Sequence, residues 1–314
     1  MNNSVIQISN LSRSFGENKA VDNLSLEVNA GEIFGFLGHN GAGKTTTVRL
    51  LNGIYSPTSG GSCVLGIDPQ VDGPALRAKT GVLTETPSLD ERLSGYENLA
   101  YYAELFALPQ EEIKARINDL LSEFGLEKQA NDKVGTYSKG MKQSLALARA
   151  LIHKPKVLFL DEPTSSLDPV AARHVTDMIE RLTRREGCTV FLCTHNLVEA
   201  QKLCDRVAVM QHGQLKALGT PAELTQQYIK RLNIELEVSE PHIEKTIDIL
   251  LANPRLVLNP PVIEKNLLVV TVSGRDAIPE ILSLLTSKDI SVYRLNPQEV
   301  NLEEVYFALN GESK

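Results

Sequence analysis

A glycine-rich segment between an apolar stretch and a helix-like stretch constrains this chain most. Residues 38–45 read GHNGAGKT and match the pattern G-x-x-x-x-G-K-[ST]. Its glycines let backbone N–H groups turn inward around phosphate oxygens, and the helix that follows points its positive end at the same anion. Lys44 is predicted to reach the β- and γ-phosphates, and Thr45 to bind Mg²⁺. The predicted nucleotide-binding residues are Gly38, His39, Asn40, Gly41, Ala42, Gly43, Lys44, Thr45 and Thr46.

Strand-like and helix-like segments alternate over the first two-thirds of the chain. Several strand-like segments are apolar at every position, which is typical of parallel strands that are covered on both faces. The pattern therefore predicts an α/β fold. Between about 94 and 150 consecutive helix-like segments indicate a helical insertion. The expected strands of this part are 5–8, 24–28, 33–37, 82–83, 157–160, 189–193 and 206–210.

The pattern changes again after about residue 225. The order of expected elements there is β-α-β-β-α-β followed by a helix, as in small ferredoxin-like α+β domains. We therefore predict a nucleotide-binding domain at 1–225, with its helical subdomain at about 86–150, and an accessory α+β domain at 229–314. The expected C-terminal strands are 232–238, 256–258, 267–272 and 291–295.

Two carboxylates follow the apolar run at 157–160. Strand ends at the carboxyl edge of an open α/β sheet are where ligands bind, so Asp161 suits Mg²⁺ and Glu162 suits the activation of an attacking water. His195 follows another apolar strand. Its imidazole could bind a γ-phosphate oxygen, although a cap of the next helix or a polar gap explains it equally.

A second anion-binding helix end is predicted at residues 138–141, before a Leu- and Ala-rich helix. A second chain, packed head to tail, could present this end to the γ-phosphate. An ordinary N-cap is the simpler explanation of Ser138 on its own.

Together these motifs resemble the ATP-binding cassette (ABC) family. GHNGAGKT, YSKGMKQ, LFLDEPTSSLDP and Cys193-Thr194-His195 have that family's order and spacing over about residues 3–225. SKGMKQ replaces the commoner SGGQ core, and this change is similar to the branch that energises exporters of drugs, antibiotics, polysaccharides and lipids. The C-terminal residues 301–306 also resemble the end of that branch. The signature residues that would act on the second copy's nucleotide are Ser138, Lys139, Gly140 and Met141.

The resemblance implies a P-loop NTPase cassette with a mixed sheet, which hydrolyses ATP with Mg²⁺ and drives a separate transmembrane permease. It implies a dimer of cassettes, a homodimer being expected, on the cytoplasmic face of the cell membrane. Phe15 corresponds to the aromatic residue that stacks on adenine, a core Phe being the alternative, and Asp168 corresponds to a dimer-interface residue. In two places the chain departs from the family: Glu85 stands where a Gln commonly contacts Mg²⁺, and Ser144 stands where an Arg commonly follows the signature.

The amino-acid composition limits the kinds of partner and compartment that we expect for this chain. The chain has 32 Lys and Arg against 39 Asp and Glu, a net charge of −7, so no nucleic-acid surface is expected. The alternative function is a soluble cassette ATPase that acts on ribosomes or DNA, but such proteins usually carry two cassettes or a long coiled coil. No apolar run approaches the ~20 residues of a membrane span. The four cysteines lack metal-ligand spacing and are expected to be buried in a reducing compartment: Cys63, Cys188, Cys193 and Cys204.

Overall fold

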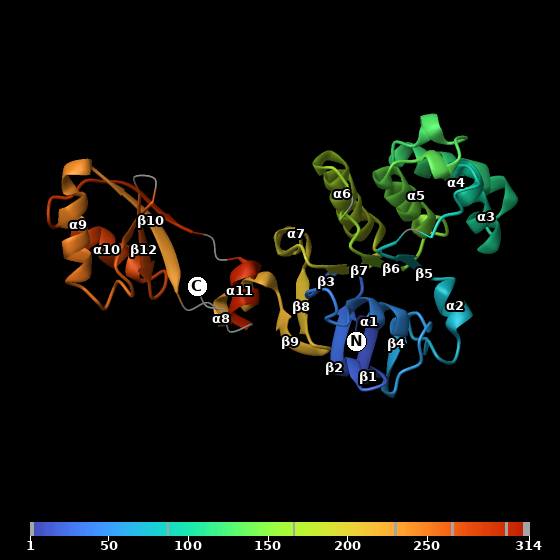
Figure 1. The fold of residues 1–314 in the computed structure, drawn as a ribbon, viewed down its shortest axis with the longest axis horizontal. Helices are drawn as coiled ribbons and strands as arrows, with labels where there is room; N and C mark the ends of the chain where they lie inside the picture. Colours follow the sequence, from blue (N-terminus) through green and yellow to red (C-terminus); the bar gives the residue numbers. More distant parts are fainter. Residues whose placement is uncertain are drawn as a thin grey trace. The chain divides into compact units, whose positions relative to one another are not determined.

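The fold is that of a computed structural model, which describes residues 3–86, 88–165, 167–228, 231–264, 267–298 and 301–309. The chain divides into two compact units, Met1–Thr220 and Pro221–Lys314 (Figure 1). The sequence predicts this boundary near residue 225. In the structure it lies after Thr220, and helix α8 (Pro221–Tyr228) therefore belongs to the second unit. Within the described residues, every helix is too short or too polar to cross a bilayer.

A six-stranded sheet forms the centre of the first unit. Its first five strands are parallel, and the last is antiparallel to its neighbour, which confirms the expected α/β sheet. The strands β3, β6 and β7 are buried along their whole length. In spatial order the strands are β5 (Thr80–Leu83), β6 (Val157–Asp161), β7 (Thr189–Thr194), β3 (Ile33–Leu37), β8 (Arg206–Gln211) and β9 (Gln214–Gly219).

A three-stranded antiparallel sheet faces this central sheet. Its order is β2 (Asn18–Asn29), β1 (Ser4–Phe15) and β4 (Ser59–Val64). Apolar residues of both sheets and of α1 (Lys44–Leu51) form one core, in which Phe34, Phe36, Phe159 and Phe191 are fully buried. In Figure 1 this antiparallel sheet lies below the central sheet, with α6 and α7 above it.

Helices α3, α4 and α5 follow one another without a strand between them, as expected for the helical insertion. Ser94 and Glu97 form a reciprocal capping box at the start of α3, which fixes where this helix begins. In Figure 1 the three helices lie together, near β5 and β6. The helices of the first unit are α1, α2 (Gly73–Arg77), α3 (Gly95–Leu105), α4 (Gln110–Glu123), α5 (Lys139–Leu151), α6 (Pro169–Glu186) and α7 (Leu197–Leu203).

The second unit contains a four-stranded antiparallel sheet with the element order β-α-β-β-α-β. Alternate residues of β10 and β12 are buried against α9 and α10, which gives this sheet a core of its own. A final helix, α11 (Leu302–Leu309), packs against α8. The spatial order is β11 (Val262–Glu264), β12 (Leu267–Val272), β10 (Leu232–Val238) and β13 (Val292–Pro297), and the helices are α9 (Ile243–Leu251) and α10 (Ala277–Thr286).

The strand predicted at 256–258 is wrong. Val257 makes only an isolated bridge to Val272, and the edge strand that pairs with β12 is β11. Pro260 and Pro261 lack the N–H groups that a ladder needs, so regular pairing begins after them. The three residues of β11 are exposed, which explains why an apolar pattern does not reveal it.

Burial differs among the four cysteines, all of which are free thiols. Cys188, Cys193 and Cys204 are buried as expected, whereas Cys63 on β4 is only half-buried. Burial raises the pKa of Cys188 to about 12, and raises the pKa of Cys193 and Cys204 further.

We expect a maleimide at neutral pH to modify Cys63 first in the folded protein, because the other three thiols are shielded and protonated. Mass spectrometry of timed samples gives the order, and all four should react after denaturation. The control is Cys63→Ser, which should leave the folded chain nearly unreactive. Modification of Cys193 before Cys63 would contradict this assignment.

Candidate active site

The glycine-rich loop runs from the end of β3 at Leu37 to the start of α1 at Lys44. Gly43 has φ of 104°, and a Cβ there would lie 2.3 Å from the Ala20 carbonyl oxygen. A Cβ on Gly38 would lie 2.7 Å from the Met210 carbonyl oxygen. Only glycine fits at these two positions, so the loop geometry depends on them directly.

Lys44 is a buried ammonium group held by this loop. Its side chain is 6% exposed, and Nζ donates to the carbonyl oxygens of Gly38 at 2.5 Å and His39 at 3.3 Å. Nζ also lies 3.8 Å from Oε1 of Glu162. A buried charge is stable only when it is paired in this way, and the pairing keeps the ammonium beside the loop that would wrap phosphates.

Thr45 and Asp161 meet at the start of α1 and the end of β6. The Thr45 hydroxyl donates to Oδ2 of Asp161 at 2.7 Å. Burial is the main cause that raises the pKa of Asp161; the Thr45 hydrogen bond lowers it, and the charges of Glu162 and Glu85 raise it. Glu85 is exposed on the loop after β5.

These residues fit a magnesium ion. Mg²⁺ is usually bound through one or two carboxylates together with substrate phosphates and water, not by a cage made entirely of protein. The described residues contain no cluster of three or more His, Cys, Asp and Glu that could hold a metal by itself. A hydroxyl and a desolvated carboxylate beside a phosphate-binding loop are the donors that such a shared site requires.

Glu162 lies directly after β6 in an unusual backbone conformation, with φ of 52°. Its side chain is buried, and Oε1 accepts the backbone N–H of His195 at 3.0 Å while Oε2 accepts the Thr194 hydroxyl at 3.3 Å. Nδ1 of His195 lies 2.7 Å from the same Oε1. This ring nitrogen is engaged by Glu162, so Nε2 is the one left for a ligand.

The N-cap of α7 excludes one of the explanations of His195. Asn196 caps this helix, because its side chain accepts the Glu199 N–H at 3.1 Å. The alternative in which His195 itself caps the next helix is therefore wrong.

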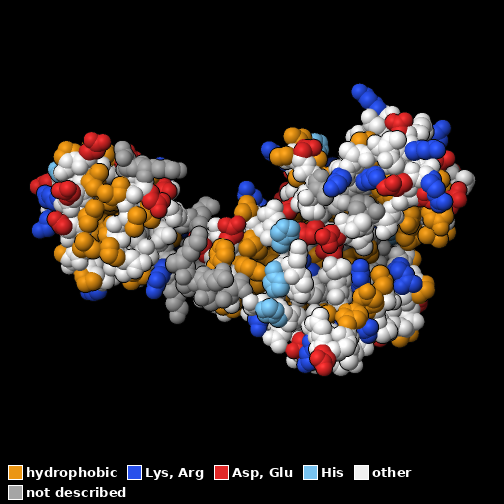
Figure 2. Space-filling model, in the orientation of Figure 1, with side chains coloured by type: hydrophobic (Ala, Val, Ile, Leu, Met, Phe, Trp, Pro, Cys, Tyr) orange, Lys and Arg blue, Asp and Glu red, His pale blue; other side chains and the backbone are white. Residues whose placement is uncertain are grey.

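A groove of about 440 Å³ brings the predicted loop and acidic residues together. Phe15, at the end of β1, also lines it and is 43% exposed. The Arg13 guanidinium lies 4.7 Å from the centroid of the Phe15 ring. Figure 2 shows His side chains beside acidic ones on this face of the unit. The residues lining the groove are Phe15, Asn18, Ala20, His39, Asn40, Gly41, Gly43, Lys44, Thr45, Thr46, Glu85, Asp161 and Glu162.

The signature residues and Asp168 are absent from the described lining of that groove. Ser138 caps α5 by accepting the Met141 N–H at 3.2 Å, so the N-cap explanation applies within one chain. Asp168 caps α6 by accepting the N–H groups of Val170 and Ala171. Ser166, its neighbour in the motif, lies outside the described residues.

Gln143 makes a contact near the site that the sequence does not predict. It is buried on α5, and its Nε2 donates to the Pro163 carbonyl oxygen at 3.2 Å. This bond ties the signature helix to the loop that follows Glu162. A buried amide within a Leu- and Ala-rich helix is the signal that could have pointed to it.

Comparison with known proteins identifies the family. Residues 21–165 match the family described as ABC transporter. An uncharacterized ABC transporter ATP-binding protein of Bacillus subtilis (strain 168), YhcH, is 33% identical over 99% of this chain and 97% of its own length. The chain belongs to the ABC transporter ATP-binding proteins. Members of this family are ATPases, as the resemblance implies.

Two further similarities extend this result. A fluoroquinolones export ATP-binding protein of Mycobacterium tuberculosis (strain ATCC 25618 / H37Rv) is 45% identical over 65% of this chain and 66% of its own length. The solved structure of cbiO1 from Clostridium perfringens, described as part of the ABC transporter complex cbiONQ, matches with a TM-score of 0.64. It is 29% identical, and the match covers 72% of this chain and 92% of cbiO1.

We expect Asp161→Asn to stabilise the nucleotide-free cassette at neutral pH. The folded chain raises the pKa of this acid, so its ionisation above that pKa costs folding free energy that a neutral amide does not. Thermal unfolding in Mg²⁺-free buffer at pH 7.5 should give a Tm higher by about 2–4 °C for each kcal/mol recovered.

The sign of this effect fixes its pH dependence. As the pH falls through the folded-state pKa, Asp161 becomes neutral and the Tm difference should close. Magnesium and ATP should raise the Tm of the unsubstituted chain but not that of Asp161→Asn. A Tm gap that widens at low pH would contradict the assignment.

Proposed function

We propose that this chain is the ATP-binding and ATP-hydrolysing subunit of an exporter whose permease is a separate transmembrane polypeptide. The observation that carries the proposal is the joint placement of Lys44, Asp161, Glu162 and His195 along one edge of the parallel sheet. The export part is supported by the fluoroquinolones export relative and by the signature SKGMKQ.

Each residue of the groove has a role in this proposal. Lys44 and the N–H groups of the loop bind the β- and γ-phosphates, and Phe15 stacks on adenine. Thr45, Asp161 and Glu85 would hold Mg²⁺, which would neutralise phosphate charge when bound. Glu162 accepts a proton from the attacking water, and His195 binds the γ-phosphate through Nε2. The His195–Glu162 contact keeps these two side chains next to each other.

The complete site requires a second cassette, and we propose a homodimer. ABC cassettes dimerise and pair with transmembrane subunits. Residues 138–141 of one copy then face the γ-phosphate bound by the other, and Asp168 lies at the interface. ATP stabilises the closed dimer and hydrolysis releases it, so the permease is driven between two states.

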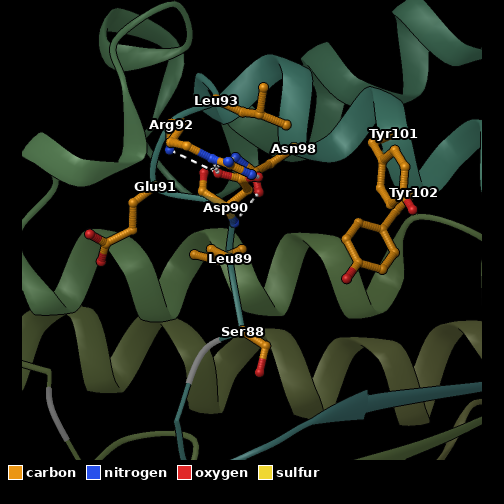
Figure 3. Close-up of a pocket in the computed structure, with 9 residues that line it drawn as sticks. All are labelled: Ser88, Leu89, Asp90, Glu91, Arg92, Leu93, Asn98, Tyr101 and Tyr102. Carbon is orange, nitrogen blue, oxygen red and sulfur yellow. Dashed lines mark hydrogen bonds and ion pairs between the residues drawn. The ribbon is translucent and has the colours of Figure 1, made fainter.

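The permease is proposed to dock on the helical insertion. A groove of about 760 Å³ there is lined by Asp90, Asn98, Tyr101 and Tyr102 among others (Figure 3). The groove combines a carboxylate with two tyrosine rings, and the hydrogen bond from the Arg92 side chain lowers the pKa of Asp90 to about 2. Arg149 of α5 donates to the Ser88 carbonyl oxygen and lies 5.0 Å from the centre of the Tyr102 ring. The signature helix is thereby in direct contact with this groove.

We propose that the protein lies at the cytoplasmic face of the membrane, where its permease holds it. The alternative, a soluble cassette ATPase that acts on ribosomes or DNA, is not favoured, because the chain is acidic and its relatives are named as transporter subunits.

We expect Glu162→Gln to bind ATP and to hydrolyse it at least 100-fold more slowly, because the amide cannot accept the proton. With Mg²⁺ and ATP the variant should elute as a dimer in size-exclusion chromatography. Lys44→Ala is the control that should lose both nucleotide binding and the dimer. A Glu162→Gln variant with normal turnover would remove the role given to Glu162.

The exporter assignment is tested by affinity purification of the tagged chain from detergent-solubilised membranes, with a salt wash. We expect a polytopic membrane protein in stoichiometric amount. Variants in which Tyr101→Ala and Tyr102→Ala are combined should lose it while retaining ATP binding. Recovery of ribosomes or nucleic acid in its place would favour the soluble alternative.

A further inference from the structure

Glu199 is a half-buried acid close to the proposed catalytic residues but outside the groove. It lies in the first turn of α7, four residues after His195. Its Oε2 accepts the Thr164 hydroxyl at 2.9 Å. Its Oε1 is buried without a hydrogen-bond partner among the described residues. A carboxyl group that leaves one oxygen unsatisfied is costly to bury, so its retention calls for an explanation.

The bond between Thr164 and Glu199 joins the same two segments as the bond between Glu162 and His195. Thr164 lies two residues after Glu162 on the loop that follows β6, and Glu199 lies on the helix that follows β7 and the His195 turn. Two separate contacts therefore connect the two segments. The Thr164 hydroxyl lies 2.9 Å from Oε2 of Glu199, and Nδ1 of His195 lies 2.7 Å from Oε1 of Glu162. Two such contacts fix the angle between the segments as well as their separation.

Glu162 depends on this kind of support. Its φ of 52° is uncommon for a residue with a side chain and persists only where neighbouring contacts hold it. Gln143 holds the loop from the α5 side through the Pro163 carbonyl oxygen. Glu199 holds it from the α7 side, one residue further along the chain.

The surroundings of Glu199 raise its pKa and so disfavour its charged form. Burial is the main cause that raises its pKa, and the charge of Glu162 raises it too, while the Thr164 hydroxyl lowers it. The acid thus lies near a like charge, and the Thr164 hydroxyl is the largest of the interactions that lower its pKa; the Thr176 side chain and the charge of His195 lower it as well.

We propose that Glu199 is a positioning residue for ATP hydrolysis. By accepting the Thr164 hydroxyl it holds the loop that carries Glu162 against the turn that carries His195, and so keeps the Glu162 carboxylate directed at the attacking water. This inference rests on the proposed role of Glu162 as the catalytic base.

A purely structural role for Glu199 makes a different prediction. An acid in the first turn of a helix stabilises the helix dipole, and its removal would lower the Tm without a selective effect on kcat. Positioning of Glu162 instead requires a loss of kcat at nearly unchanged KM for ATP, since Thr164 and Glu199 do not line the nucleotide groove.

The test uses the purified 314-residue chain with four variants: Glu199→Ala, Glu199→Gln, Thr164→Val and the double variant Glu199→Ala/Thr164→Val. Steady-state ATPase assays should show kcat reduced about tenfold in both single variants that lose the bond, with KM changed less than twofold. Glu199→Gln should stay near the unsubstituted rate, because its amide oxygen still accepts the hydroxyl. The double variant should be no slower than the slower single variant, as expected when both changes remove one interaction.

Three results would overturn the proposal: an unchanged kcat in Glu199→Ala, independent losses that multiply in the double variant, or a Glu199→Gln variant as slow as Glu199→Ala. Lys202→Ala, at an exposed position on the same helix, is the matched control and should keep its kcat. Thr164→Val removes the same hydrogen bond with almost no change of side-chain volume, so it tests the proposal even if Glu199→Ala does not fold. Failure of the proposed function is read separately from Glu162→Gln, whose normal turnover would refute that function whatever Glu199 does.

Discussion

Three charged groups buried beside one another at the carboxyl edge of a parallel sheet are the constraint on which this structure depends. Lys44, Asp161 and Glu162 are 6%, 3% and 7% exposed. A buried charge left without a partner costs several kcal/mol, roughly 3–5 where one member of a pair is removed. The loop carbonyl groups, the Thr45 hydroxyl and the His195 turn each offset part of that cost. The shape of the glycine loop and the left-handed backbone of Glu162 follow from the need to pair these charges.

The helical insertion is linked to this edge by a continuous set of contacts. Arg149 and Lys142 of α5 bond to the loop at Ser88 and Glu91, and Gln143 of the same helix bonds to Pro163 beside Glu162. One helix therefore touches both the surface groove and the acidic loop. These contacts connect the two sites structurally. Double-mutant cycles measure the energy with which the groove and the acidic loop are coupled.

Much of the first unit can be predicted from the sequence because its elements are strongly patterned. The uniformly apolar runs of β3, β6 and β7 identify central strands, and the glycine loop fixes where β3 meets α1. Contacts made by side chains distant in sequence are a different matter. The bond between Thr164 and Glu199 spans 35 residues and depends on how two strands are paired, which no local pattern encodes. In the second unit, β11 is short, exposed and preceded by two prolines, so it has no periodic signal to read.

The way in which the chain enters and leaves the sheet of the second unit makes this sheet a module. The chain enters the four-stranded sheet through β10 and leaves it through β13, and these strands are neighbours: Ile234 pairs with Pro297, and the Gln298 N–H donates to the Asn233 carbonyl oxygen at 2.8 Å. On the other side of this entry and exit, α8 and α11 pack together. Residues 231–298 thus have the form of a domain inserted between two helices that already recognise each other. Because the insert begins and ends on neighbouring strands, it can be lost, gained or exchanged in evolution while α8 and α11 stay paired.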